Sequence, residues 1–92
     1  IINKIENYSN EYVIYPNPIR NNSFINLINE SSKAISHIEM YDLNGIKQNI
    51  SIIDGLQRNY RINISNVSSG IYIIYLAFSD GSNKSTKLVI RK

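Results

Sequence analysis

Short runs in which apolar and polar residues alternate recur along most of the chain. Ile62 and Ile64, for example, alternate with Arg61 and Asn63. Because successive side chains of a strand point to opposite faces, this period of two predicts half-buried β-strands. Apart from an apolar run before the first proline, the strands predicted in this way are Phe24–Ile28, Ala34–Leu43, Ile46–Ile53, Tyr60–Ile64, Gly70–Phe78 and Thr86–Lys92.

Glycine, asparagine and aspartate mark the turns between these runs. Asn44-Gly45 supplies the positive φ that a tight hairpin needs, so we expect Ile38–Ile53 to fold back on itself there. Ile46–Ile53 is then the return strand of this hairpin. Asp54-Gly55 and Asp80-Gly81 predict two further turns.

Two prolines follow the first apolar run. Tyr12–Tyr15 leads into Pro16-Asn17-Pro18, and each proline fixes its own φ and holds the preceding residue extended. Proline cannot donate a hydrogen bond to a neighbouring strand, so we expect an edge strand or its end here. A turn at Arg20–Ser23 leads to the next strand. Ile1–Glu11 shows neither a strand period nor a helix period and is expected to be a linker.

Gly70–Phe78 is apolar on both faces, which indicates a central strand. With Tyr12–Tyr15 the chain has seven predicted strands, spaced by about 8–12 residues, and no segment fits a helix of three turns. This spacing is typical of a small antiparallel β-sandwich of immunoglobulin type, which is the all-β fold that we predict. The core is expected to contain Phe24, Ile38, Met40, Ile62, Leu76 and Leu88.

The composition agrees with this fold and limits the chemistry. The chain has 92 residues, the size of one domain, and 19 isoleucines and 14 asparagines make up more than a third of it. Isoleucine favours strands and asparagine favours turns. The absence of cysteine excludes disulfides, thiolate metal sites and thiol nucleophiles. One histidine and seven acidic residues disfavour multi-ligand metal sites and paired-carboxylate catalysis, so we expect neither an enzyme nor a cofactor.

The net charge of +3 is unevenly placed along the chain. Four basic residues lie after the last acidic residue, Asp80, and these are Lys84, Lys87, Arg91 and Lys92. Neither a basic face with stacking aromatic residues nor a binding motif predicts a nucleic-acid partner.

No transmembrane segment is expected, because the longest mainly apolar stretch, Ile71–Phe78, is far shorter than the about 20 residues of a membrane-spanning helix. The sequence begins without methionine or a signal peptide. We therefore expect it to be the C-terminal part of a longer protein whose export signal lies upstream.

Two short features bear on catalysis or metal binding. His37 has no serine, cysteine or second histidine at a recognisable spacing, and we expect it to be exposed beside Ile38. Asp42-Leu43-Asn44-Gly45 resembles the start of a calcium loop, but the further oxygen ligands and the bidentate glutamate are absent. The hairpin turn accounts for these four residues.

Two features bear on surface recognition. In a secreted eukaryotic chain the Asn-x-Ser sequons would be glycosylation acceptors, whereas the alternative places these residues in turns and on outer strand faces. The sequons begin at Asn7, Asn21, Asn29, Asn49, Asn63, Asn66 and Asn83.

Tyr72 and Tyr75 should project to opposite faces of their strand, where an exposed tyrosine can stack on a sugar or anchor a partner. The alternative is one core tyrosine and one surface tyrosine. The residues alone therefore indicate a binding or attachment module without catalytic chemistry.

Five segments, taken in order, resemble a known family. They are Tyr15-Pro16-Asn17-Pro18, Phe24-Ile25-Asn26-Leu27, Ile38–Gly45, Ile64–Tyr72 and Lys87–Lys92. Each alone is a weak signal, but the ordered set, which covers Tyr12 to Lys92, is similar to the type A C-terminal sorting domain of the type IX secretion system of Bacteroidota.

The resemblance implies a seven-stranded immunoglobulin-like sandwich that acts as a sorting signal. Residues 12–92 would be the sorting domain, and residues 1–11 the linker to an upstream, covalently joined cargo. The cargo would reach the periplasm by an N-terminal signal peptide and cross the outer membrane through the type IX translocon. A surface sortase would cut the linker, and the cargo would be attached to anionic lipopolysaccharide at the cell surface or secreted. Lys92 would be the natural C-terminus.

The residues expected to carry the family motif or its recognition are Tyr15, Pro16, Asn17, Pro18, Gly45, Gly70, Tyr72, Lys87, Leu88, Val89, Ile90, Arg91 and Lys92. The terminal strand offers a partner its backbone groups and a basic tip, by strand addition or by charge pairing.

Two other functions remain open. A carbohydrate-binding or fibronectin-like accessory module of a secreted enzyme would need a row of exposed aromatic residues, here tyrosines, on one sheet face. An adhesin or pilus subunit would need an incomplete sheet or a donor strand. Placement separates them, because a sorting domain must end its protein whereas a binding module can lie anywhere.

Overall fold

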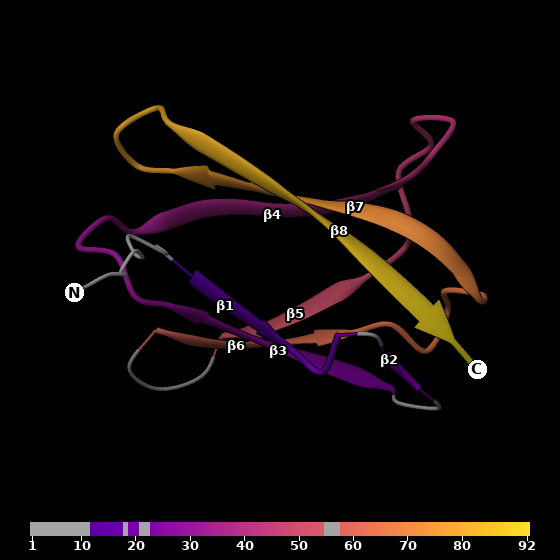
Figure 1. Cartoon of the computed structure of the whole chain (residues 1–92). Helices are drawn as coiled ribbons and strands as arrows, with labels where there is room; N and C mark the ends of the chain where they lie inside the picture. Colours follow the sequence, from indigo (N-terminus) through magenta and orange to yellow (C-terminus); the bar gives the residue numbers. More distant parts are fainter. Residues whose placement is uncertain (1–11, 18, 21–22, 55–57) are drawn as a thin grey trace, which may run out of the picture.

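The computed structural model describes residues 12–17, 19–20, 23–54 and 58–92. The predicted linker, Pro18, the middle of the predicted Arg20–Ser23 turn and Gly55 lie outside the described residues. The described part contains no helix and eight strands: β1 (Tyr12–Tyr15), β2 (Ile19–Arg20), β3 (Phe24–Asn29), β4 (Ile35–Asp42), β5 (Ser51–Asp54), β6 (Asn59–Asn63), β7 (Gly70–Phe78) and β8 (Asn83–Arg91) (Figure 1).

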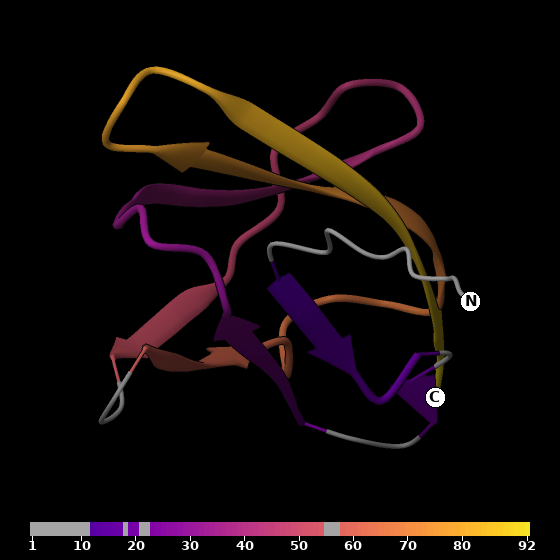
Figure 2. The same ribbon diagram turned by 60° about the vertical axis from the view of Figure 1, so that its left-hand side comes forward.

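The strands form two four-stranded sheets that lie face to face (Figures 1 and 2). Sheet A has the strand order β1-β3-β6-β5, and sheet B has the order β2-β8-β7-β4. Neighbours are antiparallel except β2 and β8, which are parallel. The expectation of an all-β fold is confirmed, and Gly70–Phe78 is a central strand as predicted.

The core lies between the sheets because each strand turns one apolar face inward. Its buried residues are Ile19, Ile25, Leu27, Ile38, Met40, Ile62, Ile64, Val67, Tyr72, Ile74, Leu76, Phe78, Leu88 and Ile90. Five of the six predicted core residues are among them. The sixth, Phe24, was assigned to the wrong face. It lies half-buried on the outer face of sheet A, where the Arg61 guanidinium covers its ring at 4.1 Å from the ring centroid.

The first predicted strand, Tyr12–Tyr15, is β1, and a short strand after the prolines that was not predicted, β2, raises the count from seven strands to eight. The chain leaves sheet A after Tyr15, passes the prolines and joins sheet B at Ile19 and Arg20. Arg20 therefore belongs to a strand and not to the predicted turn. β1 is an edge strand of sheet A, as the prolines that follow it predicted, and β2 is an edge strand of sheet B.

The predicted hairpin over Ile38–Ile53 is wrong, although its turn exists. Gly45 has a φ of +82°, and its N–H donates to the Asp42 carbonyl at 3.0 Å. Beyond the turn, pairing with β4 is limited to one bridge, between Tyr41 and Lys47. The chain then crosses to sheet A, where the short strand β5 pairs with β6, and on the way Ile50 packs, partly buried, against the core.

Candidate recognition site at the C-terminal end of the sandwich

The last residues of β8 are held from both sides. Leu88 and Ile90 point into the core, whereas Lys87 and Arg91 are exposed. Ile90 pairs with Gly70 of β7 on one side and with Ile19 of β2 on the other. The alternation of apolar and basic residues therefore anchors the end of the chain while presenting its charges to solvent.

Lys92 fixes the chain end to the segment before β7. Its backbone N–H donates to the Ser69 hydroxyl at 2.8 Å, and its ammonium donates to the Ile64 carbonyl at 2.7 Å. Lys92 thus satisfies a loop carbonyl, a structural role that its position in the basic tail did not predict.

Tyr72 closes the same loop from within. Its side chain is 5% exposed, and its hydroxyl donates to the Ser68 carbonyl at 2.7 Å. The ring folds back over Gly70, where a Cβ atom would lie 3.4 Å from the ring and the hydroxyl oxygen. Such a Cβ atom would be in ordinary van der Waals contact, so the ring packs closely over Gly70 without requiring glycine at this position. Tyr75 points to the other face, as predicted, and is half-buried on the outside of sheet B.

The proline segment lies against the terminal strand. The Asn17 side-chain amide donates to the Lys87 carbonyl at 3.4 Å, and Tyr15 is exposed on the outer face of sheet A. Gly45 follows β4, whose last residue, Asp42, pairs with Tyr72. Of the described motif residues, Asn17, Gly70 and Tyr72 therefore lie beside the terminal strand, toward the end of the sandwich where β8 finishes, whereas Gly45 follows the opposite edge strand of sheet B. We call the end where β8 finishes the C-terminal site.

An open depression of about 400 Å³ lies within this site. Its lining residues are Ser69, Gly70, Ile71, Val89, Ile90 and Arg91. Ile71 is 43% exposed, so the depression has an apolar surface beside the Arg91 guanidinium. A partner with an apolar side chain next to a carboxylate would fit this combination.

The site carries positive charge without matching acids. Within the described part of the chain, no carboxylate lies within 4.0 Å of the side-chain nitrogens of Lys84, Lys87 or Arg91. The ion pairs found there join Lys33 to Asp80 at 3.4 Å and Lys47 to Glu39 at 3.1 Å.

Both paired carboxylates have lowered pKa values. Hydrogen bonds from the Tyr41 hydroxyl and from Lys47 lower the pKa of Glu39, and the Ser82 hydroxyl and N–H lower that of Asp80. These groups stabilise the edge of sheet B and the β7–β8 turn, and they do not belong to the C-terminal site.

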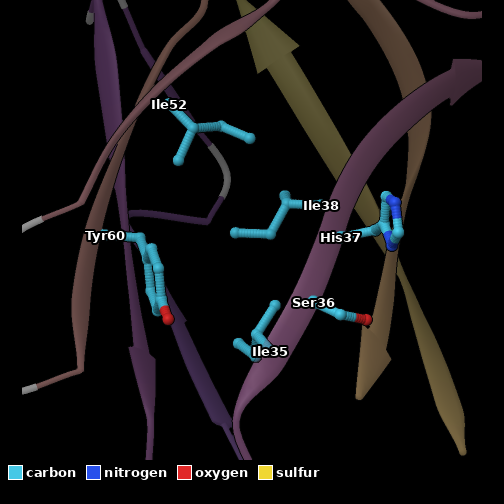
Figure 3. Close-up of a pocket in the computed structure, with 6 residues that line it drawn as sticks. All are labelled: Ile35, Ser36, His37, Ile38, Ile52 and Tyr60. Carbon is cyan, nitrogen blue, oxygen red and sulfur yellow. The ribbon is translucent and has the colours of Figure 1, made fainter. Parts of the chain in front are cut away.

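The remaining candidates lie elsewhere and have structural explanations. A cavity of about 220 Å³ opens between β4 and sheet A, with Ile35, Ile38, Ile52 and Tyr60 pointing toward one another (Figure 3). The His37 imidazole lies on the other side of β4, away from Ile52 and Tyr60 (Figure 3), and is exposed as predicted. Ser36 and His37 also line the cavity, but the side chains that face one another across it are mainly apolar.

The Asp42 carboxylate and two sequon asparagines serve turns. The Asp42 Oδ1 atom accepts hydrogen bonds from the N–H groups of Asn44 and Ile46. Asn29 Oδ1 accepts from the Ser31 N–H and hydroxyl, and Asn63 Oδ1 accepts in the same way from Ser65. The described residues contain no group of three or more His, Asp or Glu side chains placed to hold a metal ion. They also form no helix long and apolar enough to cross a membrane.

The comparison with known families assigns the chain. The model for the secretion system C-terminal sorting domain matches residues 13–91. The chain belongs to this family. Its domains are the sorting signals of the type IX secretion system, and the family is not one of enzymes. No curated protein matches the sequence.

The residues expected from the sequence to carry the family motif do not include the partners that the structure gives to Tyr72 and Lys92. Ser68, Ser69 and Ile64 accept the hydrogen bonds that fix Tyr72 and Lys92. Their signal was present as a Ser-Ser-Gly loop ahead of the central strand. The pairing of Ile19 with Ile90 joins residues far apart in the sequence, and no local pattern indicates it.

Proposed function

We propose that this domain directs an upstream cargo protein through the type IX outer-membrane translocon, and that the translocon recognises the C-terminal site. One observation carries this proposal. Residues far apart in the sequence, among them Asn17, Gly70 and Tyr72, lie beside the terminal strand, where Lys87 and Arg91 are exposed and have no carboxylate partner in the described part of the chain.

We further propose that the fold is immunoglobulin-like. The order β1-β3-β6-β5 corresponds to the first, second, fifth and fourth strands of a constant-type immunoglobulin sheet, and β8-β7-β4 corresponds to the opposing three-stranded sheet. Division of the first strand then accounts for the eighth strand. The hydrogen bond from Tyr72 at the start of β7 to Ser68 resembles the tyrosine corner of such domains.

In this proposal residues 12–92 form the sorting domain and residues 1–11 the linker to the cargo. The cargo crosses the inner membrane by its own signal peptide. A surface sortase then cuts within the linker, and the cargo is attached to anionic lipopolysaccharide or released. Family membership supports the export step, and the linker composition of Ile1–Glu11 supports a cut before the folded domain.

A carbohydrate-binding role has less support. The outward aromatic residues are divided between the two sheets, with Tyr15 and Phe24 on sheet A and Tyr41 and Tyr75 on sheet B. The Arg61 guanidinium covers the Phe24 ring. No row of exposed rings results on either face of the described part.

The test uses full-length cargo in its native host. Deletion of Lys87–Lys92 should leave the cargo in the periplasm. This deletion also removes Leu88 and Ile90 from the core, at about 1.5–3 kcal/mol each, so unfolding is a competing explanation.

Serine substitutions separate recognition from folding. Lys87→Ser with Arg91→Ser should lower surface delivery while changing stability by less than about 0.5 kcal/mol per residue. Adding Lys92→Ser tests the whole basic tip, but this change also removes a hydrogen bond to Ile64. Lys47→Ser, at an exposed position on the opposite edge of sheet B, controls for the loss of a positive charge, although it also removes the ion pair to Glu39. Normal delivery of the serine variants would refute charge recognition, and normal delivery after the deletion would refute the sorting role.

A further inference from the structure

Most of β8 has an open edge. On the side away from β7, β8 pairs with β2 only at Ile90 and Arg91. Over Asn83–Val89 no strand of the described part pairs with it there, because β1, which leads toward β2, belongs to sheet A. Figure 2 shows β8 along the margin of its sheet, with β2 beside only its end. In the described part of the chain, sheet B therefore has no further strand beside β8 over Asn83–Val89, where the Asn17 side chain reaches a backbone carbonyl, that of Lys87.

The hydrogen-bond phase of the β7–β8 hairpin tells which groups face this edge. The Phe78 N–H donates to the Ser82 carbonyl at 2.8 Å. Antiparallel pairs alternate between bonded and non-bonded, so Lys84, Thr86 and Leu88 bond to β7. The N–H groups of Ser85 and Lys87 then point to the open edge. The bond from the Asn17 side chain to the Lys87 carbonyl agrees with this phase.

The side chains beside the edge are basic on the outer face. Lys87 and Arg91 lie on that face with Val89 between them, and Lys84 stands at the start of the strand. On the inner face the Thr86 hydroxyl pairs with that of Tyr12. The cations disfavour pairing of two β8 edges with each other, because like charges would then face one another. The same cations favour a strand that carries acidic residues.

We propose that the edge of β8 over Ser85–Val89 binds an extended, acidic segment of a partner protein by β-sheet addition. The proposal rests on the function proposed above, in which the partner is a component of the translocon. Outward N–H groups recur at every second residue, about 6.8 Å apart, which is the spacing of carbonyls along an extended chain. An acidic side chain of that chain, on the outer face opposite Lys87, would lie beside the Lys87 ammonium, whereas Arg91 adds positive charge at the end of the edge where β2 pairs. An anionic lipid surface would use the charges but would leave the N–H groups without ordered partners.

The test titrates the ¹⁵N-labelled 92-residue chain with the blocked peptide Thr-Glu-Val-Glu-Val-Glu-Thr. On binding, amide exchange of Ser85 and Lys87 should slow by at least about tenfold, while exchange at Lys84, Thr86 and Leu88 changes little. Lys87→Glu should weaken binding about five- to tenfold and should favour a peptide with lysine in place of glutamate. Lys47→Glu, at the opposite edge of the sheet, should bind like the unaltered chain.

A backbone variant tests the edge independently of charge. Ser85→Pro removes an outward N–H and leaves the bonds to β7 in place, so it should abolish peptide binding while keeping a cooperative thermal transition. If this variant does not fold, the amide exchange of the unaltered chain tests strand addition instead, because binding should slow exchange at Ser85 and Lys87 but not at the residues between and beside them.

Peptide binding that is unaffected by Ser85→Pro, or that lacks the alternating pattern, would overturn the proposal. Binding to vesicles of anionic phospholipid but not to the peptide would also overturn it. If the peptide fails while delivery still requires Lys87–Lys92, the edge is not the recognition surface and the sorting role stands.

Discussion

Replacing Tyr72 with phenylalanine tests how the C-terminal site is held together. The change removes only the hydroxyl, which donates to the Ser68 carbonyl at 2.7 Å, and it leaves the ring over Gly70. The buried ring keeps its packing, so the loss of stability should equal that of one hydrogen bond.

The structure sets the size of this effect. A neutral hydrogen bond contributes about 0.5–1.5 kcal/mol, and leaving a buried acceptor without a partner costs more. Ser68 is exposed, so water can replace the lost donor at its carbonyl. We therefore expect about 1 kcal/mol of destabilisation, which lowers Tm by about 4–8 °C for a domain of this size.

Thermal unfolding followed by circular dichroism, with Tyr75→Phe as the control, measures this loss. Tyr75 lies three residues along the same strand on the opposite face, and its hydroxyl has no hydrogen bond in the described part. Tyr75→Phe should change stability by less than about 0.5 kcal/mol. Equal stabilities of the two variants would refute the stabilising role assigned to the Tyr72 hydroxyl.

Three further predictions concern other parts of the domain. In urea unfolding, Leu27→Ala should destabilise the domain by about 2–5 kcal/mol and Phe24→Ala by clearly less, since Leu27 is fully buried and Phe24 faces outward. A larger loss for Phe24→Ala would contradict the placement of Phe24 on the outer face of sheet A. Asn29→Ala should lose about 1–3 kcal/mol in the same assay, because the buried amide bonds to Ser31 and to the Lys33 carbonyl; an unchanged midpoint would show these bonds to be dispensable. Hydrogen bonds from Ser82 lower the pKa of Asp80, so the ionised carboxylate stabilises the fold at neutral pH, and this stabilisation disappears as pH falls through and below the usual carboxylate range near 4. Asp80→Asn should therefore flatten the fall of Tm with acid. A curve of Tm against pH parallel to that of the unaltered chain would count against this linkage.

The sequence predicts a strand and its position best where the residues on each face of a segment are clearly either apolar or polar. Gly70–Phe78 can only be a central strand, because its two faces are apolar and both need cover. The terminal strand, with Leu88 and Ile90 inward and Lys87 and Arg91 outward, follows the same logic. The turn residues Gly45 and Gly81 are predicted because their positive φ suits glycine.

Prediction fails where local patterns are balanced or where contacts are distant. Phe24–Asn29 carries apolar residues on both faces, so its pattern does not decide between Phe24 and its neighbour Ile25 as the residue that faces the core. The hairpin signal at Asn44-Gly45 gives a turn but cannot show that the chain then crosses to the other sheet. The parallel pairing of Ile19 with Ile90, which leaves the edge of β8 open upstream, depends on residues at opposite ends of the domain.

Transfer of the signal to a foreign protein tests the sorting function most directly. A reporter with an inner-membrane signal peptide, joined to residues 1–92 at its C-terminus, is expressed in a host with a type IX system, and its surface, medium and periplasmic fractions are compared. The same fusion without Lys87–Lys92 is the control. The account predicts that the intact fusion reaches the surface or the medium and that the shortened fusion stays in the periplasm. Retention of the intact, folded fusion in the periplasm would contradict it.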